Sequence, residues 1–417
     1  MYLNLNSERI LFIRKGVIMR KAFLMIGILV ALILTIPAIG SAADVRGVTD
    51  TEVVVGITTP LSGPAALWGM TGLGAKAWAD HINAQGGIHG RKIKVLLKDD
   101  GYNPAKAMAN LRQMKGEVFA VCGLLGTAIV NASKDFFGQN NIPLITAYGD
   151  TRIWTTVSPE SLRYAFITYP DYEDEGQYLT TYAIKNLGSK KVAVFYQNDD
   201  YGKKGLAGIK KGIASTAGKA KLVSAVPCEV TERALSTHAL KLKESGADTL
   251  LMYVTPVHGA IITKTMAKIG YSPQQVLASF PLADAIMYKI AGPTWEGTYL
   301  GIPGNVDLPG SDANADRVAE ILIKYNPKVK ASTFLALFGA SSMMQLAEGL
   351  KNAGPNLTPE SMIAGMEKIK DWKAEGMGAR TTYGPDRRQG NNAVRLGQAK
   401  GGKVIGLEPW TVFQPHF

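Results

Sequence analysis

Residues that could carry out chemistry are scattered along this chain of 417 residues and form no recognised catalytic or metal-binding motif. The five histidines lie far apart: His81, His89, His238, His258 and His416. The sequence lacks HExxH and CxxC spacings, which hold metal ions, and also the GxSxG nucleophile motif and the GxxxxGK(S/T) phosphate loop. We therefore expect no cofactor and no metal site.

Asp99 and Asp100 are neighbouring carboxylates that could act together in acid–base catalysis. They follow a predicted strand over 92–98. Because adjacent residues of a strand point to opposite faces, we do not expect the two carboxyl groups to share one site. The sequence predicts that the protein is not an enzyme, since an amidase or hydrolase would need a nucleophile and a base that are not evident.

The composition is that of a globular protein, with 46% hydrophobic and 19% charged residues. The formal net charge is +12, but the basic residues form no dense run. This distribution favours a solvated surface over a nucleic-acid-binding patch. The two cysteines, Cys122 and Cys228, are too few for a cysteine-based zinc site or a disulfide scaffold.

The N-terminal region predicts export from the cytoplasm. Arg20 and Lys21 precede an apolar run over 22–36, and small residues follow up to Ala43. A run of about 15 residues is short for a membrane span, which needs about 20, so a cleavable signal peptide ending at Ala43 is favoured over an uncleaved anchor. The residues before Met19 do not fit a signal peptide, and we infer that 1–43 is a signal peptide with a mis-assigned N-terminal extension.

After residue 43 the chain alternates between strand-like and helix-like segments. Predicted strands cover 52–57, 92–98, 118–122, 142–146, 191–197, 221–226, 249–253 and 276–279. Predicted helices include 70–84, 129–138, 235–244, 314–324, 331–351 and 359–369, and 393–411 alternates like a hairpin. Apolar strands that are each followed by a helix predict parallel sheets covered on both faces.

The predicted strands fall into two series, over about 48–165 and 170–295, with a polar crossover at 168–176. The helical region 297–380 has too few strands for a third domain and is expected to complete the first two. The fold class is therefore α/β, with two doubly wound lobes beside a cleft. In such sheets ligands bind outside the carboxyl ends of the strands.

Residues 53–110 contain SGP, an aromatic residue before glycine, INAQGGIHGRKI and DDGYNPAKA. This combination resembles the opening of the leucine/isoleucine/valine-type periplasmic binding proteins, which serve ABC importers. Further matches are IPLIT at 142–146, KKVAVFYQNDDYGKKG at 190–205 and WEG at 295–297. The resemblance implies a periplasmic, monomeric Venus-flytrap protein with a three-crossover hinge, which binds a small molecule and docks onto ABC permease subunits without catalysis.

The resemblance also implies how the chain divides between the lobes. The N-terminal lobe would comprise 48–168 and 297–380, and the C-terminal lobe 169–296 and 381–417. Cys122 and Cys228 would then lie in different lobes. A bridge between them would block hinge motion, so both are expected to be free thiols.

Ligand-binding residues follow from the resemblance position by position. Trp68 matches an aromatic residue beside the ligand, and Tyr201 matches one that closes over it from the second lobe. Two loops, Gly126–Thr127 and Ala147–Tyr148, match those that hold the ligand's carboxylate, and a helix N-terminus favours an anion on physical grounds. Structural alternatives stay open: Trp68 in the core, Tyr201 capping a helix, and Thr127 serving its own backbone as an N-cap.

The second lobe departs from the amino-acid-binding pattern. At the position of the carboxylate that pairs with an α-ammonium, the sequence has Phe280 and Pro281, and Thr255 replaces a usual aromatic residue. Burying an unpaired ammonium costs several kcal/mol, although Asp284 or Asp150 could substitute. We expect the ligand to be a small hydrophobic or aromatic carboxylate, a branched-chain amino acid or an amide. A periplasmic sensor that signals to a membrane receptor is the alternative function.

Overall fold

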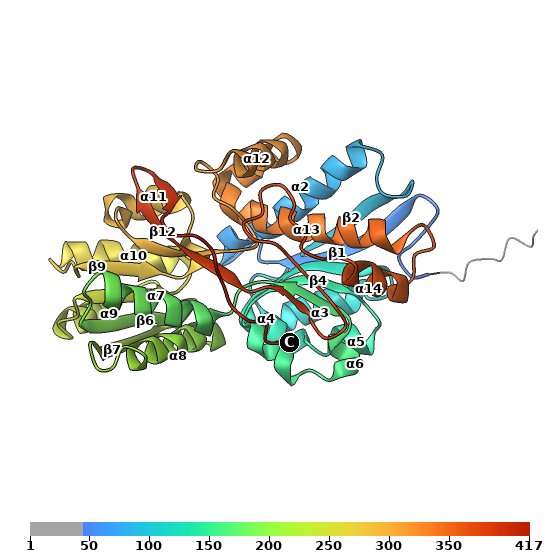
Figure 1. The fold of residues 1–417 in the computed structure, drawn as a ribbon. Coiled ribbons are helices and arrows are strands. Elements are labelled where there is room, and N and C mark those ends of the chain that lie inside the picture. The colour runs from blue at the N-terminus through green and yellow to red at the C-terminus, as the bar shows by residue number, and fades with distance from the viewer. Residues whose placement is uncertain (1–44) are drawn as a thin grey trace, which may run out of the picture. The chain divides into compact units, whose positions relative to one another are not determined.

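Two β-sheets, both mainly parallel and covered by helices, organise residues 45–417, which are those that this computed structural model describes (Figure 1). Residues 45–417 form one compact unit. The predicted signal peptide lies outside the described residues. Among the described helices, none combines the length and the apolar character that a membrane crossing requires.

The first sheet has the strand order β11-β5-β4-β3-β1-β2, and every pairing in it is parallel. Its strands are β1 (Glu52–Thr59), β2 (Lys92–Asp99), β3 (Ala120–Leu125), β4 (Leu144–Tyr148), β5 (Ala165–Thr168) and β11 (Gln389–Asn391). Strands β3, β4 and β5 are buried along their whole length, as expected for a sheet with helices on both faces.

The second sheet has the order β13-β12-β10-β9-β8-β6-β7, and β14 also pairs with β12. Its strands are β6 (Lys191–Gln197), β7 (Lys221–Cys228), β8 (Thr249–Tyr253), β9 (Gln275–Ala278), β10 (Tyr299–Pro303), β12 (Ala393–Lys400), β13 (Lys403–Gly406) and β14 (Thr411–Val412). Strands β6 to β10 have the same spatial order as β1 to β5 in the first sheet. In each sheet the second strand, β7 or β2, lies at the edge beside the first strand, β6 or β1. The α/β prediction and the predicted hairpin near residue 401 are confirmed.

Helices on the first sheet form, with it, the first lobe. They are α2 (Met70–Ala84), α3 (Pro104–Met114), α4 (Thr127–Ser133), α5 (Phe136–Gln139), α6 (Pro159–Leu162), α12 (Ala313–Tyr325), α13 (Thr333–Ala353) and α14 (Pro359–Glu367), with 3₁₀ turns η1 (Ala66–Gly69), η2 (Thr151–Thr156) and η5 (Pro327–Ala331). The second lobe has α7 (Tyr172–Asn186), α8 (Asp200–Ala214), α9 (Ser236–Glu244), α10 (Pro256–Lys268) and α11 (Ile286–Ala291), with η3 (Phe280–Leu282) and η4 (Gly292–Trp295).

Strand pairing differs from the predicted lobe boundaries in two places. Strand β10 follows residue 297 but pairs with β9 and β12 in the second sheet. Strand β11 follows residue 381 but pairs with β5 in the first sheet. Both strands are short and lie beside chain crossings, so no periodic pattern marks them. The predicted crossover 168–176 is also shorter, since α7 already begins at Tyr172 with Asp171 as its N-cap.

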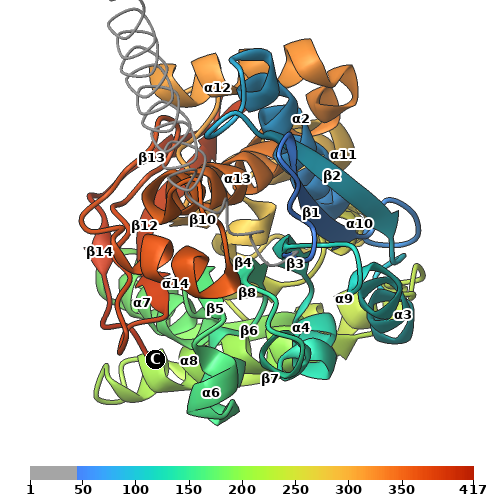
Figure 2. The same ribbon diagram turned by 90° about the vertical axis from the view of Figure 1, so that its right-hand side faces the viewer.

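Helices α2 and α13 pack unusually closely in the first lobe (Figure 2). A Cβ atom on Gly74 of α2 would overlap the carbonyl oxygen of Ala336, and one on Gly339 of α13 would overlap that of Thr71. Glycine at both positions therefore lets the two backbones touch. This contact fixes one side of α13 against the first turns of α2, the helix that follows β1.

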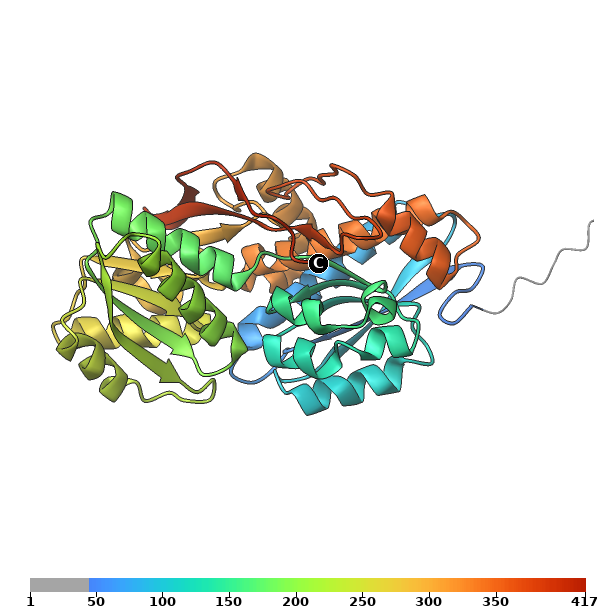
Figure 3. The ribbon, with the colours of Figure 1, turned by 60° about the horizontal axis from the view of Figure 1, so that its bottom comes forward.

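The chain passes between the sheets at 169–171, 304–312 and residue 392. After β14 the C-terminal segment returns to the first lobe, where the Phe417 carbonyl oxygen accepts hydrogen bonds from the N–H groups of Arg388 and Gln389 (Figure 3). The lobes are thus joined by several short segments rather than by one flexible linker.

Candidate functional site

A pocket with an empty volume of about 410 Å³ lies between the two lobes. Its lining comprises Trp68, Thr71, Tyr102, Leu125, Gly126, Thr127, Tyr148, Tyr169, Tyr172, Tyr201, Pro281, Leu335 and Phe338. Most of these residues follow the carboxyl ends of β1 to β6 and β9, where an α/β sheet is expected to bind ligands. None of the residues in this described lining carries a charge.

Five of the eight residues predicted from the sequence line this pocket: Trp68, Gly126, Thr127, Tyr148 and Tyr201. They come from both lobes, as predicted. Ala147, Thr255 and Phe280 lie outside the lining.

Each of the three outside the lining has a structural role. Ala147 pairs with Leu124 inside the first sheet. The Thr255 hydroxyl caps α10 and bonds to the buried His258 ring. Phe280 is fully buried behind the pocket, where its ring stacks on Tyr172 at 5.4 Å between centroids.

The structure decides two of the alternatives left open by the sequence. Helix α8 is capped by the Asp199 carboxylate, so the Tyr201 side chain is not needed as a cap. Helix α4 begins after Gly126, and the Thr127 hydroxyl accepts a hydrogen bond from the distant Asp150 N–H at 3.1 Å. Thr127 is therefore not an N-cap and keeps its own hydroxyl proton available.

Aromatic rings form most of the pocket wall. The Trp68 ring lies edge-on to Tyr102 at 5.4 Å and to Tyr201 at 6.4 Å between centroids, and Tyr172 meets Tyr201 at 4.7 Å. Trp68 is thus both a lining residue and part of the packing, at 6% exposure.

Sequence reasoning missed Tyr102, Tyr169, Tyr172 and the α13 residues Leu335 and Phe338. The position of the three tyrosines, just after β2 and β5, was the available signal. Tyr102 also has a φ of 63°, an uncommon value for a side chain this large. Leu335 and Phe338 reach the pocket only through the α2–α13 packing, which no local pattern predicts.

Two polar groups of the wall have no protein partner in the described residues. The Trp68 Nε1–H and the Tyr201 hydroxyl are both buried and unpaired. The Tyr148 hydroxyl, in contrast, is occupied, because it contacts the Phe338 carbonyl oxygen at 2.6 Å and the Ser342 hydroxyl. Burial raises the pKa of Tyr201 well above its ordinary value, so its hydroxyl stays neutral. The free groups are neutral hydrogen-bond donors.

Four acidic side chains lie behind the wall rather than in it, and all are buried: Asp100, Asp150, Glu175 and Asp284. Glu175 was missed by the sequence reasoning because it lies on α7, far in sequence from the loop that it contacts. Its carboxyl group accepts hydrogen bonds from the Ser279 hydroxyl and the Phe280 N–H, each at 2.7 Å. Burial raises the pKa of Glu175 to about 8, so it is largely protonated at neutral pH.

Asp99 and Asp100 have separate structural roles, as their opposite orientations predicted. Burial raises the pKa of Asp100 to about 6, and its carboxylate orients Tyr102 by accepting the Tyr102 N–H at 2.8 Å. Burial of Asp99 acts in the same direction, but hydrogen bonds from Ser62, Gly101 and Lys106 outweigh it and lower the pKa of Asp99 well below its ordinary value. Cys122 and Cys228 are both free and buried.

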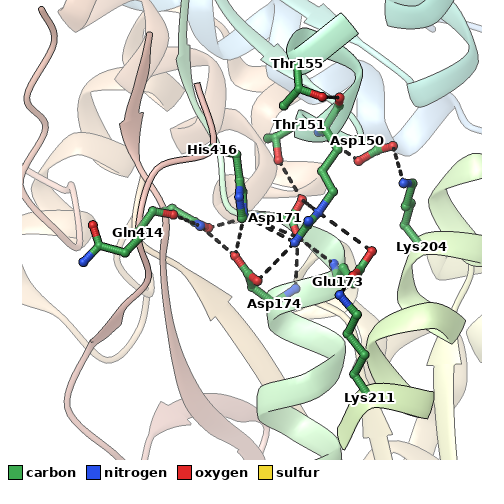
Figure 4. A network of polar contacts seen from close by, with 12 residues as sticks. Asp150, Thr151, Thr155, Asp171, Glu173, Asp174, Lys204, Lys211, Gln414 and His416 are labelled. Carbon is green, nitrogen blue, oxygen red and sulfur yellow. Dashed lines mark hydrogen bonds and ion pairs between the residues drawn. The ribbon is translucent and has the colours of Figure 1, made fainter. Parts of the chain in front are cut away.

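A polar network ties the first crossing, Asp171, to both lobes (Figure 4). Arg152 of η2 donates to the Asp171 carboxylate at 3.0 Å and to Asp174 of α7 at 3.3 Å. His416 lies 2.8 Å from Asp174. Asp171, Asp174 and His416 lie close enough to hold a cation, but the Arg152 guanidinium already supplies positive charge there.

Comparison with known proteins agrees with this architecture. Residues 52–403 match the family described as "Periplasmic binding protein". The Leu/Ile/Val-binding protein homolog 3 of Brucella melitensis biotype 1 is 25% identical over 362 residues, which are 86% of this chain and 94% of the relative.

Similar solved structures share the fold. A fatty acid ABC transporter substrate-binding protein from Thermomonospora curvata has a TM-score of 0.76 and 20% identity over 88% of this chain and 94% of its own. A branched-chain amino acid transporter substrate-binding protein from Streptococcus pneumoniae, solved with isoleucine, has a TM-score of 0.70 and 20% identity over 88% and 100%. The match to the family model over residues 52–403 shows that the chain belongs to the periplasmic binding protein family, and its two sheets with a pocket at their carboxyl ends agree with this.

Proposed function

We propose that this protein is the extracytoplasmic solute-binding protein of an ABC importer, and that its ligand is a small apolar or aromatic molecule with a carboxylate or amide group but no α-ammonium. Ligand that bridges the two lobes would stabilise their closed arrangement, which the permease subunits recognise. The uncharged wall of the interlobe pocket carries this proposal.

An α-ammonium group would be poorly matched by this wall. Its burial without a carboxylate partner costs several kcal/mol. The Glu175 carboxyl group behind the wall already accepts hydrogen bonds from the Ser279 hydroxyl and the Phe280 N–H. Its raised pKa leaves it mostly uncharged at neutral pH, so it cannot serve as the partner of an ammonium group. The wall offers aromatic surface for an apolar body instead.

An oxygen acceptor fits the free donors of the wall. Trp68 Nε1–H and the Tyr201 hydroxyl are buried without partners, and a buried polar group that stays unpaired is costly. A ligand carboxylate or amide oxygen would satisfy them, together with the Thr127 hydroxyl proton. We propose Trp68, Gly126, Thr127, Tyr148 and Tyr201 as ligand-contacting residues, joined by Tyr102, Tyr169 and Tyr172.

The names of similar proteins are compatible with more than one ligand class. One structural neighbour is named for fatty acids and another was solved with isoleucine. The first class has a carboxylate without an ammonium, which is the chemistry that the uncharged wall favours. The quantity to measure is therefore the difference in binding between ligands with and without an α-ammonium group.

A thermal-shift panel of matched pairs tests the ligand class. Each pair consists of an amino acid and its deamino analogue: phenylalanine with 3-phenylpropanoate, and leucine with 4-methylpentanoate. We expect the deamino compounds to raise the melting temperature more than the parent amino acids. A larger shift with both amino acids would contradict the proposed class, and uptake of the best compound by cells with and without this protein would separate an importer component from a sensor.

A further inference from the structure

Asp284 is a buried carboxyl group at which the two lobes meet. It follows η3 of the second lobe, is 4% exposed, and accepts the Ile286 N–H at 2.9 Å. Its other oxygen accepts a hydrogen bond from the hydroxyl of Ser332. Ser332 belongs to the first lobe, where it is the N-cap of α13 and accepts the Leu335 N–H at 3.1 Å. This contact therefore crosses from one lobe to the other.

The contact lies directly behind the pocket. Pro281, three residues before Asp284, and Leu335, three residues after Ser332, both line the wall. Asp284 itself is not part of the lining. If the lobes separate to admit a ligand, the Asp284 carboxyl group loses Ser332 and becomes exposed to water.

No counter-ion compensates the Asp284 carboxylate in the described residues. Lys289 on α11 and both lysines of η5, Lys328 and Lys330, are exposed and make no ion pair with it. On the elements packed against η3, the His258 ring is held by Thr255 and the Glu232 carbonyl oxygen, and Glu175 bonds to the Phe280 N–H. An ionised carboxylate buried with only a hydroxyl and one N–H is unfavourable, and protonation relieves that cost.

We propose that closure of the lobes is coupled to uptake of a proton by Asp284, so that the protein holds its ligand more tightly in mild acid than at neutral pH. This inference rests on the proposed function, because it requires a ligand-driven closure. The direction follows from linkage: a group that binds protons more strongly in the closed form favours closure as the pH falls.

The size of the effect follows from the burial of this group. Burial raises the pKa of Asp284 from 3.8 to about 6 in this arrangement, in which Asp284 and Ser332 join the lobes. If opening returns it to its ordinary value, this group alone should make ligand affinity about tenfold higher at pH 5 than at pH 7.5 and contribute about half a proton to the uptake on binding at pH 6. Asp150 adds to this in the same direction, because burial also raises its pKa to about 6.

Asp150 is a second interlobe carboxylate, but its surroundings differ. It lies 4.0 Å from Lys204 of α8 in the other lobe (Figure 4). Asp171, Asp200 and the Arg152 N–H also act on it. Its contribution should thus depend on salt concentration and remain in a variant that lacks only the Asp284 charge.

The test is calorimetry with 3-phenylpropanoate from pH 5 to pH 7.5, on the wild type, on Asp284→Asn, and on Asp386→Asn as an exposed control. Asparagine keeps the shape but cannot titrate. We expect the ratio of affinities between pH 5 and pH 7.5 to be about tenfold smaller in Asp284→Asn than in the wild type, and to be unchanged in Asp386→Asn. An unchanged pH dependence in Asp284→Asn would overturn the proposal.

A second measurement needs no variant. Wild-type calorimetry at pH 6, in two buffers with different ionisation enthalpies, should report proton uptake on binding, and a value of zero would overturn the proposal.

If no compound of the panel binds, the proposed ligand class fails instead. Small-angle X-ray scattering of ligand-free protein then decides. A radius of gyration that decreases from pH 8 to pH 5 by more in the wild type than in Asp284→Asn supports proton-linked closure. Equal decreases in the two proteins contradict it.

Discussion

Replacement of Glu175 by glutamine should change how the free energy of unfolding depends on pH. Glu175 is fully buried, and burial raises its pKa from 4.5 to about 8. The folded protein therefore keeps this proton up to about pH 8, whereas the unfolded chain releases it near pH 4.5. Stability from this group is present at low pH and is lost as the pH rises between those values.

The magnitude can be worked from these two pKa values. Between pH 5 and pH 8 the folded state loses roughly 3 kcal/mol relative to a chain in which this group cannot titrate. Glutamine is such a group, with nearly the same shape. Its carbonyl oxygen can still accept the Phe280 N–H, and its amide can donate to the Ser279 hydroxyl, which can reverse its direction.

Urea denaturation of both proteins at pH 5, 6, 7 and 8 measures the effect. The difference in unfolding free energy, wild type minus Glu175→Gln, should fall by roughly 3 kcal/mol from pH 5 to pH 8. Titration of Asp150 and Asp284 is common to both proteins and cancels in this difference. A difference that does not vary with pH would refute the claim that Glu175 is a protonated acid.

Three further outcomes are expected. Trp68→Phe should weaken binding of 3-phenylpropanoate about tenfold by calorimetry, whereas Trp372→Phe, outside the pocket, should leave it unchanged; equal affinities would remove Trp68 from the site. Gly339→Ala should lower the unfolding free energy by about 2 kcal/mol or more, because the new Cβ would overlap the Thr71 carbonyl oxygen. Gly116→Ala is the control and should be nearly neutral, since the space around Gly116 is open. Similar values for both variants would contradict the close packing of α2 and α13. Cys122 and Cys228 should not react with a thiol reagent at pH 8 until the protein unfolds, since burial raises the pKa of Cys228 to about 12 and that of Cys122 further; rapid reaction of the native protein would show that they are accessible.

Local patterns were sufficient for the longer elements that form the sheets and the helices beside them. Helix 70–84 and strand 191–197 agree with α2 and β6 at both ends, because an uninterrupted periodic pattern is bounded by turn residues there. The short strands β5, β10 and β11 have no such pattern. Their formation depends on the neighbouring strands with which they pair, so the sequence could not place them.

The candidate site divides in a similar way. Trp68 lies in the 3₁₀ turn that follows β1, and Thr127 and Tyr201 lie in the first turns of the helices that follow β3 and β6. The carboxyl-end rule, together with the family resemblance, was therefore sufficient to predict them at the pocket. Glu175 and Phe338 depend on how whole helices pack, which no loop motif encodes. Phe280 was predicted to line the pocket but lies behind it. Its ring stacks on Tyr172, and the neighbouring residue Pro281 lines the wall instead.

The central claim is that the pocket accepts an apolar ligand without an α-ammonium group. Calorimetry at pH 7 with phenylalanine and with 3-phenylpropanoate measures it directly, because the two compounds differ only in that group. The uncharged wall predicts that 3-phenylpropanoate binds at least as tightly as phenylalanine. If removal of the ammonium instead weakened binding by more than about 3 kcal/mol, the scale of a broken buried charge pair, an acidic side chain must reach the ligand and the claim would be contradicted.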